Sequence, residues 1–115
     1  MSEAVTVAER RAGAPVPAGA SIQVMTGFYE GLEMPVDRDW FVIGRGRAAD
    51  AVLSEPTISR AHAAIAYEGT DGFFVQDLGS TNGTTVNGER NERTLLADGD
   101  EIQMGKLRIR VALPR

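Results

Sequence analysis

From Ser21 onward the chain is a succession of short apolar or alternating runs that are separated by turn signals. Each run has the length of a strand and is too short for a stable helix. The runs are SIQVMTGF, EMPV, WFVIG, DAVL, AAIAYE, GFFVQDL, TTVNG, EIQMG and KLRIRVAL. After Gly72 no window of ten or more residues has apolar residues at helical spacing. Strands spaced this closely by turns predict an all-β sandwich of two packed, mainly antiparallel sheets.

The last run, residues 106–113, has the clearest alternation of apolar and charged residues. Side chains of a strand point alternately to its two faces. The inward face is expected to carry Leu107, Ile109, Val111 and Leu113. Arg108 and Arg110 are expected on the solvent face.

The first twenty residues differ from the rest of the chain. They are rich in alanine and include GAPVPAGA, in which Pro15 and Pro17 favour an extended backbone. We expect residues 1–20 to form a flexible N-terminal tail and residues 21–115 to form one folded domain. The start of the chain does not have the pattern of a secretory signal, so we expect none, and no run in the sequence is long enough to span a bilayer.

The composition excludes several classes of function. Cysteine is absent, which rules out disulfides, a thiolate nucleophile and the usual structural zinc sites, and fits a cytoplasmic protein. The formal net charge of −4 argues against broad binding of nucleic acid or of anionic membranes. Any site for an anion is therefore expected to be local.

The segment FVIGRGRAAD, residues 41–50, contains the pattern G-x-G-x-x-A of dinucleotide-binding proteins. That site needs a helix that opens at Gly46 and a crossover to a parallel strand. Pro56 closes the available segment, DAVL is typical of a strand, and no α-crossover follows. We therefore interpret the fingerprint as a coincidence, and Glu68, near the distance of a ribose-binding acid, as a surface residue at a strand end.

In a sandwich, the loops that follow the strands at 40–43, 51–53 and 73–78 can converge at one end. Their polar residues are Arg45 and Arg47 in the first loop, Ser59, Arg60 and His62 in the second, and Ser80, Thr81, Asn82 and Gly83 in the third. Guanidinium groups, hydroxyls and free backbone amides suit a tetrahedral dianion. This composition is typical of phospho-motif recognition.

The same residues are a poor match for the requirements of a catalytic site. One histidine lacks partners for a metal, and the segment around Ser59 has no nucleophile elbow. Phosphoryl transfer would need a metal-binding acid and a P-loop lysine. We expect no enzyme activity, no metal and no cofactor.

The segments IGRGRAAD, TISRAHAAI and DLGSTNGTTVNG, in this order and spacing, resemble the forkhead-associated (FHA) domain, a phosphothreonine-binding β-sandwich of the FHA/SMAD-like type. The resemblance covers roughly residues 21–113. It implies that Arg45 binds the phosphate, that the Ser59 hydroxyl donates a hydrogen bond to the phosphate, and that Arg60 adds a second donor. It also implies that Thr81 lines the pocket around the phosphothreonine and that Asn82 binds the ligand backbone just after it.

The resemblance also implies structural support of the site by Gly44, His62 and Gly83. Gly44 allows a close backbone approach, His62 braces the Ser59 loop with a hydrogen bond, and Gly83 makes a turn. Arg47 is not a position of the family pattern, and we interpret it as a solvated loop residue. Asn87-Gly88 is typical of a hairpin turn.

The sequence thus predicts a monomeric module that binds phosphothreonine in partner proteins modified by a Ser/Thr kinase, with no role for nucleic acid or membrane. Discrimination against phosphoserine is expected from a slot for the γ-methyl group beside Thr81. Two alternatives stay open: a scaffold that binds unmodified partners, and a self-regulated module whose phosphorylated Thr6 occupies its own pocket.

Overall fold

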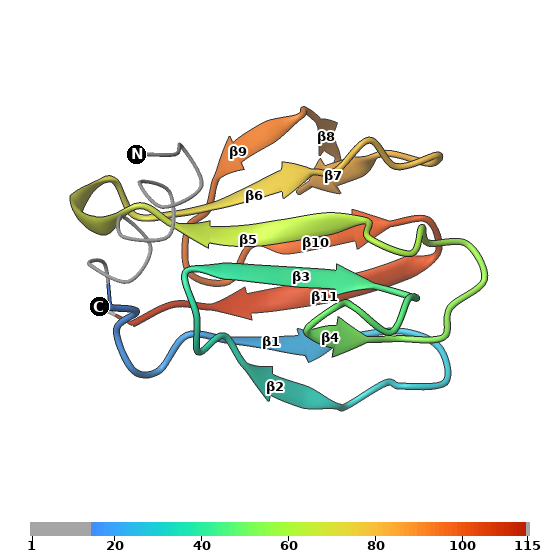
Figure 1. Cartoon of the computed structure of the whole chain (residues 1–115), viewed down its shortest axis with the longest axis horizontal. Helices are drawn as coiled ribbons and strands as arrows, with labels where there is room; N and C mark the ends of the chain where they lie inside the picture. Colours follow the sequence, from blue (N-terminus) through green and yellow to red (C-terminus); the bar gives the residue numbers. More distant parts are fainter. Residues whose placement is uncertain (1–14, 115) are drawn as a thin grey trace, which may run out of the picture.

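The computed structural model describes residues 15–114, which form a sandwich of two β-sheets (Figure 1). The six-stranded sheet has the order β2-β1-β11-β10-β7-β8, and the five-stranded sheet has the order β4-β3-β5-β6-β9. The strands are β1 (Ser21–Val24), β2 (Glu33–Pro35), β3 (Trp40–Gly44), β4 (Ala51–Val52), β5 (Ala63–Tyr67), β6 (Phe73–Asp77), β7 (Thr84–Val86), β8 (Glu89–Arg90), β9 (Arg93–Leu95), β10 (Glu101–Met104) and β11 (Leu107–Ala112). The only helical element in residues 15–114 is a 3₁₀ turn, η1 (Gly69–Asp71). The predicted fold class is confirmed.

The sheets are antiparallel except for one pair, β3 with β4. Every run predicted from the sequence contains a strand, whereas β8 and β9 were not predicted. The turn at Asn87-Gly88 joins β7 to β8, and both residues have positive φ, 50° and 88°. That conformation matches the twist of a two-residue hairpin, so this turn was predicted correctly.

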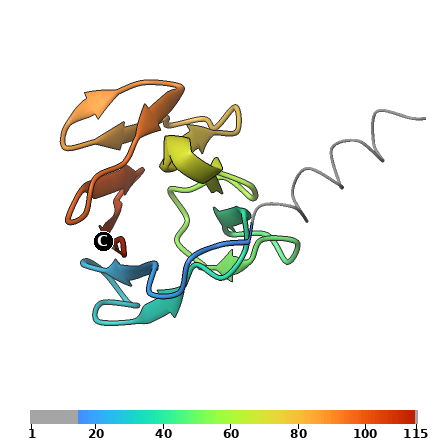
Figure 2. The same cartoon turned by 90° about the vertical axis from the view of Figure 1, so that its left-hand side faces the viewer.

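Figure 2 shows the two sheets facing each other from one end of the sandwich. The core consists of the buried apolar side chains between them. In β11 Leu107, Ile109 and Val111 are buried and both arginines are exposed, as the alternation predicted. Leu113 is half-buried and packs against the core. The sandwich therefore provides a rigid support for the loops at its ends.

Residues 15–20 precede β1. Val16 packs against the core, Ala20 is buried, and the Ala20 carbonyl accepts a hydrogen bond of 2.8 Å from the Val36 amide. The division of the chain at residue 20 stays a prediction. Thr6 lies outside the described residues. Within residues 15–114 we find no helix with the length and apolar character needed to cross a membrane.

The dinucleotide interpretation needed a helix at Gly46. Instead, the chain turns after β3 and enters β4, which pairs with β3 directly. Glu68 is exposed after the end of β5, and its carboxylate pairs with the Arg93 guanidinium at 3.0 Å. Both features agree with the interpretation of the fingerprint as a coincidence.

Candidate functional site

Three loops, residues 45–50, 53–62 and 78–83, meet at the end of the sandwich to which β3, β4 and β6 point (Figure 1). Backbone hydrogen bonds join the first two loops, from the Arg45 amide to the Ser59 carbonyl (3.1 Å) and from the Gly46 amide to the Arg60 carbonyl (3.0 Å). The Thr81 amide donates to the Ser59 hydroxyl at 3.2 Å and joins the third loop. The convergence expected from the sequence is present.

Gly44, the last residue of β3, allows the first contact between these loops. A Cβ atom at this position would overlap the backbone carbonyl of Arg60 and lie 3.1 Å from Cα of Ala61. At Gly46 a Cβ would lie 3.1 Å from Cβ of Arg60 and 3.2 Å from its carbonyl oxygen, which requires a shift of only a few tenths of an ångström. The close backbone approach expected at Gly44 therefore has a steric basis in the structure.

We expect Gly44→Ala to destabilise the domain by about 3 kcal/mol, because the new methyl group must displace the backbone at Arg60. Gly46→Ala is the matched control in the same loop and should cost less than about 1 kcal/mol. Chemical denaturation followed by tryptophan fluorescence measures both. Equal losses for the two variants would contradict the close-approach explanation.

The Arg45 side chain is exposed but held in place at one edge. Its Nε–H donates to the Ile58 carbonyl at 2.8 Å. Within residues 15–114 its two terminal amino groups have no hydrogen-bond or ion-pair partner. Because the guanidinium group is planar and rigid, fixing Nε also fixes the direction in which the free end can bind an anion.

Ser59 lies beside Arg45 at the junction of the loops. Its hydroxyl oxygen accepts the hydrogen bond from the Thr81 amide, so the hydroxyl hydrogen is left to donate elsewhere. Within the described chain no acceptor for that hydrogen occurs. Ser59 therefore offers one donor at the surface where the three loops meet.

His62 is fully buried and links two of the loops. Its Nδ1 accepts a hydrogen bond from the Ser59 amide (3.0 Å), and its Nε2 lies 2.8 Å from the Gly83 carbonyl. A neutral ring with its proton on Nε2 satisfies both contacts, since an amide can only donate and a carbonyl can only accept. Neither nitrogen is left to activate a nucleophile or to bind a metal. Residues 15–114 also contain no cluster of His, Asp and Glu side chains that could hold a metal ion.

Asn82 is exposed, and its side-chain amide donates to the Thr57 carbonyl at 2.7 Å. This bond orients the side chain and leaves its carbonyl oxygen and one N–H available. Asn82-Gly83 does not form a plain hairpin, because β6 and β7 belong to different sheets. Gly83 has a φ of 79°, in the left-handed region that favours glycine.

Asp77 holds the third loop in shape through hydrogen bonds. This role was not predicted from the sequence. One carboxylate oxygen accepts hydrogen bonds from the amides of Gly79 (3.0 Å) and Ser80 (2.9 Å), and the other accepts from the hydroxyls of Ser80 and Thr84. Burial raises the pKa of Asp77, but the hydrogen bonds from Ser80 and Thr84 lower it by more, so its pKa lies below its ordinary value. The segment DLGS, with an aspartate before a glycine turn, carries the signal for such a capped turn.

Arg47 and Arg60 are both exposed, and their guanidinium groups have no hydrogen bond or ion pair within the described residues. The Arg60 backbone is fixed by its contact with Gly46, whereas Arg47 lies farther along the first loop. The structure thus brings together the loops that carry Arg45, Ser59, Arg60, Thr81 and Asn82.

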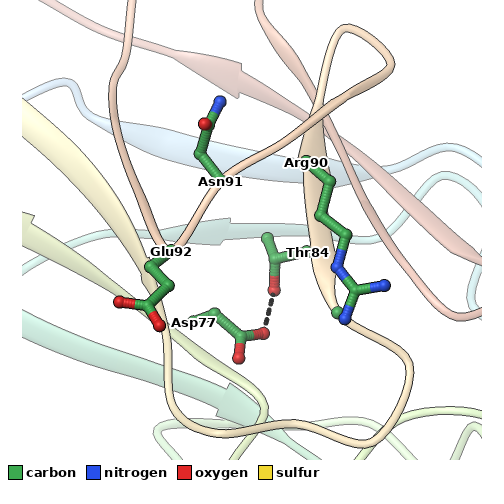
Figure 3. A pocket seen from close by; sticks show the side chains of 6 residues that line it. Asp77, Thr84, Arg90, Asn91 and Glu92 are labelled. Carbon is green, nitrogen blue, oxygen red and sulfur yellow. Dashed lines mark hydrogen bonds between the residues drawn. The ribbon is translucent and has the colours of Figure 1, made fainter.

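A polar pocket of about 410 Å³ lies beside the third loop, and Figure 3 shows the side chains that line it. It is lined by Asp77, Gly83, Thr84, Arg90, Asn91 and Glu92. The Arg90 guanidinium packs so closely on Gly83 that a Cβ atom there would lie 2.5 Å from Arg90 Nε. Since Arg45, Ser59 and Asn82 do not line this pocket, it is distinct from the surface where the three loops meet.

Comparisons with known proteins agree on one family. A family model for the FHA domain matches residues 41–105. The chain is 39% identical over 95 residues to the glycogen accumulation regulator GarA of Mycolicibacterium smegmatis, which covers 82% of this chain and 60% of that protein. It is 41% identical over 95 residues to the oxoglutarate dehydrogenase inhibitor of Corynebacterium diphtheriae, which covers 81% of this chain and 65% of that protein. The match thus spans less than two thirds of both relatives.

A solved structure from a structural and functional analysis of phosphothreonine-dependent FHA domain interactions superposes with a TM-score of 0.76. It is 33% identical and covers 86% of this chain and 99% of that chain. The likeness therefore extends over nearly the whole of that chain.

Proposed function

Because the chain belongs to the FHA domain family, we propose that it binds phosphothreonine in partner proteins through the loops 45–50, 53–62 and 78–83. The observation that carries the proposal is the free end of the Arg45 guanidinium, which is held in position through Nε beside the unused hydroxyl hydrogen of Ser59. Two fixed donors at one surface suit a phosphate with several acceptor oxygens.

In the proposed complex, Arg45 binds phosphate oxygens with its terminal amino groups, and Ser59 donates its hydroxyl hydrogen. Arg60, exposed at the edge of the same surface, adds a second positive charge. A hydrogen bond to a charged group contributes about 1.5 to 3 kcal/mol, so these contacts supply most of the dependence on the phosphate.

Thr81 and Asn82 would contact the phosphorylated residue and the backbone next to it. The Thr81 amide donates a hydrogen bond to the Ser59 hydroxyl, which places Thr81 beside Ser59. Thr81 would line a slot for the γ-methyl group of phosphothreonine. Asn82, oriented by Thr57, would hydrogen-bond the backbone that follows the phosphorylated residue. A contact to the backbone would fix the register of an extended peptide.

The module would act by binding and not by catalysis. Its relatives are named as a regulator of glycogen accumulation and an inhibitor of oxoglutarate dehydrogenase. We extend this to a role for the chain as a monomeric regulator that recognises proteins modified by a Ser/Thr kinase.

The test is calorimetric titration with a peptide selected from a randomised phosphothreonine library. We expect removal of the phosphate to weaken binding at least about 100-fold, because the charge-assisted contacts are lost. A phosphoserine version should bind about fivefold more weakly, since one methyl group is no longer buried. Equal binding of the phosphorylated and unphosphorylated peptides would overturn the proposal and favour a scaffold for unmodified partners.

A further inference from the structure

The loop between β1 and β2 carries an apolar tip at the same end of the sandwich as the three loops of the site (Figure 1). Phe28 is 94% exposed, the most exposed of the large apolar residues in the described chain. It contacts Tyr29 edge to face, with ring centroids 5.1 Å apart, and Leu32 of the same loop is 39% exposed. We call Phe28, Tyr29 and Leu32 the apolar tip.

The loop that presents the apolar tip is an ordered turn. Its backbone is closed by hydrogen bonds from Glu30 to Gly27 (3.2 Å), from Leu32 to Tyr29 (2.9 Å) and from Gly31 to Val24 (2.8 Å). The turn therefore holds Phe28 away from the core by its geometry. Tyr29 is half-buried and packs against the core, so Phe28 and Leu32 form the exposed part of the apolar tip. Neighbouring exposed apolar side chains mark a candidate interaction surface.

One connection joins the apolar tip to the second loop of the site. The Tyr29 hydroxyl oxygen accepts a hydrogen bond of 3.2 Å from the amide of Ser54. Ser54 lies in the loop of residues 53–62, which also carries Ser59. The tip thus lies against the segment that supplies the proposed phosphate donor.

A second connection runs through the turn between β10 and β11. The Thr26 hydroxyl donates to the Lys106 carbonyl (3.2 Å), and the Lys106 amide donates to the Thr57 hydroxyl (2.8 Å). The Thr57 carbonyl in turn accepts the hydrogen bond from Asn82. These hydrogen bonds therefore connect Asn82, the proposed contact for the peptide backbone, to the loop of Phe28.

We propose that the apolar tip is a second contact for the polypeptide that carries the phosphothreonine, and that an aromatic or aliphatic side chain of that polypeptide packs on Phe28. The proposal rests on the proposed function, because it takes the occupant of the phosphate site as the occupant of the tip. Continuity with that site favours the same partner over an unrelated one. A stable protein interface buries about 800 Å² on each partner, which requires surface beyond a small phosphate site.

The experiment compares two synthetic libraries around one phosphothreonine, a short one with about three random residues on each side and a long one with about ten. Ten extended residues reach about 33 Å, which matches the 31 Å width of the domain. We expect the wild-type protein to select aromatic or aliphatic residues at distant positions of the long library. Phe28→Ser should weaken the selected long peptides about tenfold, or about 1.4 kcal/mol, and leave the short ones unchanged.

Leu95→Ser is the matched control, because Leu95 is 58% exposed on β9, away from the loop of Phe28. It should bind both sets of peptides as the wild type does. Arg45→Ala should weaken the binding of both sets of peptides. If it does not, the proposed phosphate site is wrong, whereas an unchanged affinity of Phe28→Ser for the long peptides means that only the proposal for the apolar tip is wrong.

Selected long peptides that bind Phe28→Ser as tightly as the wild type would overturn the proposal. So would sedimentation showing a wild-type dimer that Phe28→Ser abolishes, because the occupant would then be a second copy of the chain.

Discussion

Arg45→Ala is expected to weaken binding of a phosphothreonine peptide about 100-fold while leaving the stability of the domain within about 1 kcal/mol. The loss in affinity follows from the free guanidinium end, whose amino groups have no competing partner within residues 15–114. The stability changes little because the side chain is exposed and contributes one hydrogen bond, to the Ile58 carbonyl. Calorimetric titration and chemical denaturation measure the two effects separately.

Arg47→Ala is the matched control for this prediction. Arg47 lies in the same loop, is exposed, and carries the same charge. If only the local positive field mattered, both variants would lose affinity equally. We expect Arg47→Ala to weaken binding less than about threefold, since an exposed charge without a direct contact contributes little. Equal losses would contradict a specific role for Arg45.

His62→Ala is expected to destabilise the domain by about 3 kcal/mol and to weaken phosphopeptide binding with it. The change leaves the Ser59 amide and the Gly83 carbonyl without partners and opens a cavity at a fully buried position. Because His62 joins the second and third loops, its loss should also disturb the placement of Ser59. Urea denaturation measures the stability change.

Gln103→Ala provides the comparison for His62→Ala. Gln103 is exposed and makes one hydrogen bond, to the Gly105 carbonyl at 3.1 Å. Its removal should change stability by less than about 0.5 kcal/mol. Unchanged peptide affinity of folded His62→Ala, measured where the variant remains native, would contradict the bracing role.

The longer strands could be predicted from the sequence because alternation records which face is buried. β11 is the clearest case, with its buried apolar residues between exposed arginines. β9 was missed because Arg93–Leu95 has one apolar residue and no alternation, and its place beside β6 depends on pairing across the sheet. β8 was missed because it has two exposed charged residues, although its turn was predicted.

The sequence predicted which residues form the candidate site but not the hydrogen bonds that join them. Gly-Arg, Ser-Arg-x-His and Asn-Gly mark loops in the sequence, and these loops meet in the structure. The roles of Asp77 and Thr57 depend on the shape of the loops, since they act through hydrogen bonds to backbone amides and to the side chain of Asn82. Phe28 belongs to an apolar run in the sequence, and its exposure arises because β1 ends at Val24 and the turn at Gly27 redirects the chain.

The most direct test of the proposed phosphothreonine site is an NMR titration of the ¹⁵N-labelled domain with a selected peptide in phosphorylated and unphosphorylated forms. We predict that the phosphorylated peptide shifts the amide signals of residues 45–46, 59–60 and 80–83 and the Arg45 Nε signal. The turn at 68–72, at the other end of the sandwich, should not respond (Figure 1). Equal shifts with the unphosphorylated peptide, or shifts centred on the turn at 68–72, would contradict a phosphothreonine site in these loops.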